Sequence, residues 1–91
     1  DVIKLHDFEE EELIAMELLL IKIRLRPETI PQALQIAELV GAQVIAVSDS
    51  SMVLALASEE KKVNGAIRML KPLGIIELSR SGTLAVSSRD R

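Results

Sequence analysis

The most constraining feature of this 91-residue sequence is an alternation that runs from Met16 to Arg26 and stops at Pro27. Successive side chains of a β-strand point to opposite faces, so every second residue shares a face. One set of alternate residues is entirely aliphatic: Leu19, Ile21, Ile23 and Leu25. The other set begins aliphatic and ends basic: Leu18, Leu20, Lys22, Arg24 and Arg26. We therefore expect a long strand that buries the first set and ends at Pro27, which has no N–H to pair.

Two amphipathic helices are predicted, over Thr29 to Val40 and over Ser58 to Lys71. In the first, Thr29 and Gln32 have the spacing of a capping box and Gly41 follows the last turn. In the second, Ser58 is the expected N-cap and Pro72 stops the helix. Helical spacing of the apolar residues predicts that each helix packs one side on a sheet. The residues expected to face it are Ile30, Ala33, Leu34 and Ala37 in the first helix, and Val63, Ala66, Ile67 and Leu70 in the second.

The remaining apolar segments are short and bounded by turn residues. Gln43 to Ser48 and Met52 to Ala57 flank Asp49-Ser50-Ser51, which predicts a β-hairpin. Ile75 to Ser79 is a last strand, and a turn at Ser81-Gly82 leads to a short apolar stretch, Leu84 to Val86.

The order strand, helix, strand, strand, helix, strand predicts an α+β fold of the ferredoxin-like βαββαβ type. Its antiparallel sheet carries both helices on one face. The other face has no helix to cover it, and Leu18 and Leu20 point to that face. We expect a partner to pack there, in a homodimer or a higher homo-oligomer.

Composition excludes several classes of function. The chain has no cysteine, one histidine, His6, and one aromatic residue, Phe8. Thiolate metal sites, catalytic acid–base pairs and base-stacking platforms therefore lack their side chains, and no glycine-rich phosphate-binding motif occurs. We predict no catalytic residue, no cofactor, no metal and no nucleic-acid partner. No apolar run approaches the roughly 20 residues that span a bilayer, and a chain without cysteine fits the cytoplasm.

Several segments resemble the regulatory small subunit of acetohydroxyacid (acetolactate) synthase. Leu70 to Gly82, followed by Leu84-Ala85-Val86-Ser87, is similar to the closing pattern R-P-[FY]-G-I-x-E-V-x-R-[ST]-G-x-x-[AG]-[LM]-S-R of that family. Glu17 to Ile23 is similar to its strand R-E-L-x-L-I-K-V. Ala37-Glu38-Leu39 through Val47-Ser48 is similar to its segment A-E-I-F-x-A-x-I-V-D-V-S.

The resemblance implies an ACT-like fold and a noncatalytic role. Residues 1–13 would be the end of a preceding ACT domain plus an acidic linker, and residues 14–91 the C-terminal regulatory domain. In the family, a branched-chain amino acid binds an N-x-x-G-x-[LM] loop of the ACT domain, and the sequence has no such loop. The expected partner is the thiamine-diphosphate-dependent catalytic large subunit. The domain would contact and activate that subunit and relay feedback inhibition in branched-chain amino acid biosynthesis.

A second function stays open at this stage: a small-molecule-sensing ACT-like domain of another regulator. A thermal shift with branched-chain amino acids separates the two, because a ligand at 100 times its dissociation constant stabilises a protein by about 2.7 kcal/mol.

The candidate interface residues form two groups: Leu18, Leu20 and Lys22 on the long strand, and Arg80, Ser81 and Gly82 in the turn after the last strand. Three cations share this face of the long strand, and they either receive an anion or keep the sheet edge or face soluble: Lys22, Arg24 and Arg26. For Arg80 two partners are considered. Its guanidinium either bonds carbonyl groups at a helix end or reaches a carboxylate on the catalytic subunit or on a neighbouring regulatory chain.

Overall fold

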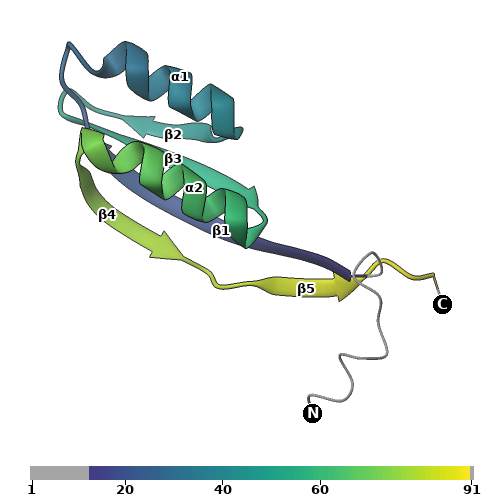
Figure 1. The fold of residues 1–91 in the computed structure, drawn as a ribbon. Helices are drawn as coiled ribbons and strands as arrows, with labels where there is room; N and C mark the ends of the chain where they lie inside the picture. Colours follow the sequence, from purple (N-terminus) through teal and green to yellow (C-terminus); the bar gives the residue numbers. More distant parts are fainter. Residues whose placement is uncertain (1–12, 91) are drawn as a thin grey trace.

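The computed structural model describes residues 13–90, which form one antiparallel sheet with two helices on one of its faces (Figure 1). The strand order is β2-β3-β1-β4, and β5 also pairs with β1. This arrangement confirms the predicted α+β, ferredoxin-like fold. In chain order the elements are β1 (Leu13–Arg24), α1 (Ile30–Val40), β2 (Gln43–Val47), β3 (Ser51–Ser58), α2 (Glu60–Leu70), a 3-10 turn (Lys71–Leu73), β4 (Ile75–Arg80) and β5 (Leu84–Ser87).

The central strand β1 buries the alternate residues that the sequence predicts. Leu19 and Ile23 are fully buried, and Ile21 and Leu25 are nearly so. From Glu17 to Arg24, β1 pairs with β3 on one edge. On its other edge it pairs with β4, in a ladder that contains a register shift between Lys22 and Ile23. The core lies between this face of the sheet and the two helices.

The strand β1 is longer than predicted. It begins at Leu13 rather than Met16, because its first four residues pair with β5, and it ends at Arg24 rather than Arg26. The short apolar stretch from Leu84 to Val86 is thus a strand, and the two segments form a two-stranded ribbon that extends beyond the helices (Figure 1). Of the expected linker and preceding ACT strand, residues 1–13, only Leu13 lies within the described residues, and it belongs to β1.

The first helix confirms Ala33 and Ala37 of the predicted stripe but not Ile30 and Leu34, which are exposed. Its buried residues are Ala33, Ile36 and Ala37, whereas Leu34 is 48% exposed. The prediction for Leu34 is wrong because apolar residues occupy more than one side of α1, and the spacing alone admits two stripes. Ala33 and Ala37 belong to both stripes, and the packing of α1 on the core buries the one that contains Ile36.

The predicted caps are corrected in both helices. The Thr29 side chain makes no cap bond to α1; its hydroxyl donates to the Arg26 carbonyl and accepts from the Arg26 N–H, both at 3.2 Å. Because Thr29 is used in this turn, no capping box forms. Glu59 rather than Ser58 precedes α2, since Ser58 is the last residue of β3 and pairs with Glu17. Gly41, with φ of 77°, ends α1 as predicted.

The second helix follows its predicted stripe. Val63, Ala66 and Leu70 are buried, and Ile67 packs partly buried against the core. The helix ends at Leu70 and tightens into the 3-10 turn that contains Pro72. The buried Leu73 of this turn belongs to the core as well.

The packing of α1 gives a direct test by substitution. We expect Ile36→Ala to lower the free energy of unfolding by about 2–5 kcal/mol, because it removes buried methyl and methylene groups and leaves a cavity. Leu34→Ala removes a half-exposed side chain and is expected to cost under about 1 kcal/mol. Urea unfolding of the two variants measures both values. A larger loss for Leu34→Ala than for Ile36→Ala would contradict the observed orientation of α1.

Candidate protein-contact surface

The sheet face opposite the helices carries a continuous row of exposed aliphatic side chains. Even-numbered residues of β1 point to this face, and β5 adds the residues directly opposite Ile14 and Met16. Six side chains form the row, with exposed fractions from 42% to 69%: Ile14, Met16, Leu18 and Leu20 of β1, and Leu84 and Val86 of β5. We call these six residues the apolar stripe. Small neighbours flank it, because Leu18 lies opposite Ala57, and Leu20 lies between Ala55 and Ser79.

The stripe ends where the same face becomes charged. Lys22 is the next residue of β1 on this face, and its Nζ lies 3.7 Å from Glu77 Oε2 on β4. The two residues are also Cα partners in the ladder. Arg24 follows on β1 and is exposed. Lys22 is thus paired within the chain, and the face combines an apolar half with a charged half.

The structure places Leu18 and Leu20 on the uncovered face, as predicted, with exposed fractions of 44% and 43%. Sequence reasoning missed the other four members of the stripe. For Ile14 and Met16 the signal was present, because they continue the alternation of β1 toward its start. For Leu84 and Val86 it was absent, since their place beside β1 depends on a pairing across about seventy residues of chain.

Glu17 and Arg80 form a two-bond ion pair at the helix-covered side of the sheet. Arg80 Nε donates to Glu17 Oε2 and Arg80 Nη2 donates to Glu17 Oε1, both at 2.7 Å. Glu17 is 4% exposed and is the buried charged residue of the part the structure describes, while the Arg80 side chain is 31% exposed. A planar guanidinium fits both carboxylate oxygens at once, so the pair fixes geometry as well as charge.

The electrostatics of the pair favour its charged form. The hydrogen bond from Arg80 holds the pKa of Glu17 below its ordinary value, although burial acts in the opposite direction. The positive charge of Arg80 and the Gly82 backbone N–H lower this pKa further. The same hydrogen bond raises the pKa of Arg80, and Glu60 at the start of α2 adds to this shift. Glu17 therefore remains a carboxylate in the folded protein at neutral pH.

Ser81 and Gly82 complete the junction between β4 and β5. The Ser81 N–H donates to the Leu18 carbonyl at 3.0 Å, and the Leu18 N–H donates to Ser81 Oγ at 2.9 Å. Gly82 has φ of 79°, a conformation that glycine adopts without strain. The chain thus bends out of β4 and returns to the same edge of β1 as β5. The three predicted interface residues Arg80, Ser81 and Gly82 are brought together here, against Glu17 and Leu18.

The partner of Arg80 differs from both alternatives that the sequence suggested. Its guanidinium bonds a carboxylate of its own chain rather than carbonyls at a helix end. Glu17 lies two residues before Leu19 and therefore belongs to the buried set of alternate residues. A single charge in an otherwise apolar set needs a partner, and this was the signal for the ion pair with Arg80.

Neither a metal centre nor a membrane span is found in the part of the chain that the structure describes. Residues 13–90 contain no group of three or more histidine, cysteine or acidic side chains placed to hold a metal ion. Within the same residues, neither helix is long and apolar enough to cross a membrane. His6, the one histidine of the sequence, lies outside the described residues.

A family comparison decides the identity of this domain. The family model described as the small subunit of acetolactate synthase matches residues 16–89, from β1 to just beyond β5. The chain belongs to the acetolactate synthase small-subunit family. The match covers the apolar stripe except Ile14, and also the Glu17–Arg80 pair.

Individual relatives agree with this assignment to the acetolactate synthase small-subunit family. The chain is 38% identical over 85 residues to the acetolactate synthase small subunit of Bacillus subtilis, covering 93% of the chain and 49% of that protein. It is 34% identical over 91 residues to the one from Mycolicibacterium smegmatis, covering 100% of the chain and 54% of that protein. The chain thus spans about half the length of these relatives.

A solved structure of the family has the same fold. The crystal structure of the acetolactate synthase small subunit from Thermotoga maritima aligns with a TM-score of 0.82 at 24% sequence identity. The alignment covers 90% of the chain and 50% of that structure.

The Glu17–Arg80 pair predicts an effect on stability. We expect Arg80→Ala to lower the melting temperature by several degrees, because it leaves a buried carboxylate without its partner. Adding Glu17→Gln to Arg80→Ala replaces the stranded charge with a neutral amide and should recover part of the loss. The control is Arg24→Ala, because Arg24 is an exposed cation on β1, the strand that carries Glu17. Equal melting temperatures for Arg80→Ala and the control would contradict a stabilising pair.

The same pair predicts a dependence on pH. Because the pKa of Glu17 is lower in the folded than in the unfolded chain, its stabilising contribution is present above about pH 4.5 and is lost as the pH falls further. The melting temperature of Glu17→Gln should therefore fall less steeply below that pH than that of the unaltered chain.

Proposed function

We propose that this chain is a noncatalytic regulatory module that binds and activates the catalytic large subunit of an acetolactate synthase. We also propose that this module relays feedback inhibition. An amino-acid effector binds elsewhere in the small subunit, and this module passes the signal to the thiamine-diphosphate-dependent catalytic subunit. We place this activity in the cytoplasm, as part of branched-chain amino acid biosynthesis. Membership of the small-subunit family supports the role, and the apolar stripe is the observation that carries it.

The apolar stripe is suited to a protein contact and to little else. Six half-exposed aliphatic side chains in one row exceed the scattered single residues that are ordinary on a protein surface. A twelve-residue strand is about 40 Å long, so the face along β1 has the length of a standard protein interface. Aliphatic side chains provide neither a nucleophile nor a general base, and their contribution to binding is burial.

The occupant that we propose for the stripe is a second copy of the chain. Two identical sheet faces related by a two-fold axis bury the same residues on both sides, which places apolar against apolar without an unpaired charge. The ion pair between Lys22 and Glu77 then lies at the margin, where partial exposure to solvent is tolerated. The resulting regulatory dimer presents its helix layers outward, toward the catalytic subunit.

This proposal predicts the behaviour of Leu20→Glu. A carboxylate in the middle of the stripe must be desolvated on association, so we expect the dimer dissociation constant to rise by more than about tenfold. Sedimentation equilibrium measures it, with circular dichroism to show that both helices persist. Leu34→Glu is the matched control, since Leu34 is also about half exposed but lies on α1. A monomeric unaltered chain, or equal dimerisation of the two variants, would remove the proposed role of the stripe.

The regulatory role itself is tested by reconstitution. Added to the purified catalytic subunit, the full encoded subunit that contains this chain should raise the rate of acetolactate formation, and Leu20→Glu should require a higher concentration to do so. Lack of any effect of the unaltered subunit on that rate would reject the proposed function.

A further inference from the structure

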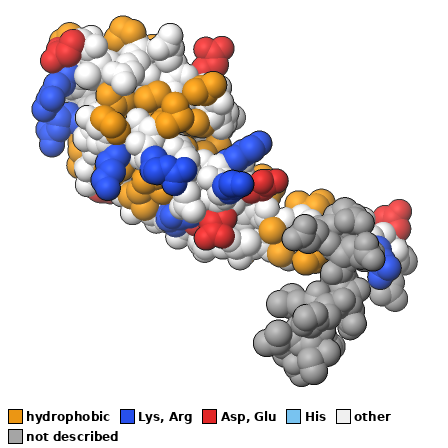
Figure 2. Space-filling view, in the orientation of Figure 1, with side chains coloured by type: hydrophobic (Ala, Val, Ile, Leu, Met, Phe, Trp, Pro, Cys, Tyr) orange, Lys and Arg blue, Asp and Glu red, His pale blue; other side chains and the backbone are white. Residues whose placement is uncertain are grey.

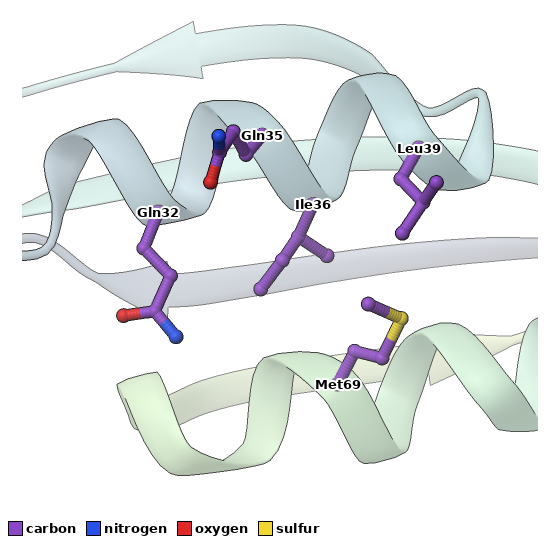
Figure 3. A pocket seen from close by; sticks show the side chains of 5 residues that line it. All are labelled: Gln32, Gln35, Ile36, Leu39 and Met69. Carbon is purple, nitrogen blue, oxygen red and sulfur yellow. The ribbon is translucent and has the colours of Figure 1, made fainter.

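The helix layer contains a groove on the side of the molecule opposite the apolar stripe. One part of about 490 Å³ is lined by Gln32, Gln35, Ile36, Leu39 and Met69. A second part of about 260 Å³ is lined by Leu39, Val40, Lys62, Gly65, Ala66 and Met69. Both parts share Leu39 and Met69, so they form one continuous groove between α1 and α2. Ile36 and Leu39 point from α1 toward α2, and Met69 points back toward them (Figure 3). We call this surface the helix groove.

Gly65, in the middle of α2, has no explanation within the chain. A glycine in a helix interior weakens the helix relative to alanine, because it is the most flexible residue when unfolded. Gly65 does not have a positive φ, and a Cβ built on it would meet nothing within 4 Å. Neither backbone conformation nor internal packing therefore requires glycine here. A missing side chain that faces open space in a groove allows the backbone of another molecule to approach closely.

The charged residues of α2 after Glu60 are all basic. From Lys61 to Ile76 the sequence contains no acidic residue, and α2 and its 3-10 turn carry four exposed cations: Lys61, Lys62, Arg68 and Lys71. No ion pair is found for these four within residues 13–90. Lysine and arginine side chains lie over α2 next to hydrophobic ones (Figure 2). The single charged residue that lines the groove is Lys62.

We propose that the helix groove binds an acidic amphipathic helix of the catalytic subunit. This inference rests on the proposed function and adds the surface and the chemistry of the contact. The apolar side of the bound helix lies on Ile36, Leu39 and Met69, and its backbone passes over Gly65. Its carboxylates meet Lys61, Lys62 and Arg68, whose charges have no partner in the described part of the chain. The two amides, Gln32 and Gln35, offer donors and acceptors at the far end of the groove.

The same cations could attract any anion, but the groove favours a peptide. Its floor is aliphatic and thioether, which suits leucine-like anchors at helical spacing. A nucleic-acid backbone gains from cations without needing an apolar floor, and the part the structure describes has no aromatic side chain on which a base could stack. The proposed contact is therefore with protein.

Substitution of Gly65 separates binding from folding. Gly65→Ala should raise the melting temperature by about 2–8 °C, because alanine favours the helix and meets no clash. Gly65→Leu should fill the groove and weaken binding to the catalytic subunit more than tenfold, with Gly65→Ala weakening it less. Binding is measured by surface plasmon resonance between the full encoded subunit and the purified catalytic subunit. If Gly65→Leu lowers the melting temperature, the test rests on the binding of Gly65→Ala to the catalytic subunit. Weaker binding by this more stable variant supports the contact, because it cannot result from unfolding.

Charge reversal tests the acidic partner. Lys61→Glu combined with Lys62→Glu should weaken binding more than tenfold and flatten its dependence on salt, whereas Arg26→Glu, in the turn before α1, should leave binding unchanged. Retained binding by both Gly65→Leu and the double reversal overturns this inference alone. Failure of the unaltered subunit to bind the catalytic subunit overturns the proposed function with it. If the double variant still binds the catalytic subunit but loses binding to RNA or to vesicles, the cations serve those partners. That result would overturn the proposed contact with an acidic helix.

Discussion

The strand β1 is the constraint on which the rest of the structure depends. Its twelve residues pair with β3 on one edge and with β4 and then β5 on the other. Every other residue of this strand is buried from Glu17 onward, and from Leu19 onward these side chains belong to the core on which the helix layer packs. The intervening residues define the uncovered face of the sheet. Removal of a single residue from β1 would move the core side chains to solvent, because side-chain direction alternates along a strand.

The Glu17–Arg80 pair and Ser81 hold the chain where β1 leaves the helix-covered body. At this point β4 ends, and the chain must bend before β5 can pair with the start of β1. The two-bond ion pair fastens the end of β4, and the Ser81 backbone and hydroxyl fasten the bend to Leu18. For Arg80 the sequence suggested either carbonyls at a helix end or a carboxylate on another chain. Its planar guanidinium instead bonds Glu17 of the same chain, so Arg80 stabilises the fold at this junction.

Sequence patterns predicted the elements whose signal is local. The alternation of β1, the glycine after α1 and the stripe of α2 follow from neighbouring residues and were confirmed. The errors arose where distant residues decide. Leu34 and Ile36 both suit a helix stripe, and only the packing of α1 on the sheet selects Ile36. Ser58 has the chemistry of an N-cap but is used by β3, whose pairing with β1 extends to this residue. Leu84 and Val86 of the stripe were missed, since β5 becomes a strand only beside β1. Ile14 and Met16 were missed although they continue the alternation of β1.

The apolar stripe and the helix groove lie on opposite sides of the domain, so each can contact a different partner. We propose that the apolar stripe contacts a second copy and that the helix groove binds the catalytic subunit. In this proposal β1 carries the signal, because its alternate residues belong to the stripe and to the core, so a shift of the strand would move both.

Thiol labelling tests this claim directly, because the sequence contains no cysteine and each introduced one is unique. Leu18→Cys and Leu39→Cys place a thiol on the stripe and beside the groove. We expect self-association to slow the labelling of Leu18→Cys at least tenfold and to leave Leu39→Cys reactive. Addition of the catalytic subunit should then slow the labelling of Leu39→Cys. Protection of Leu39→Cys by self-association, with Leu18→Cys still reactive, would contradict the assignment of the two faces.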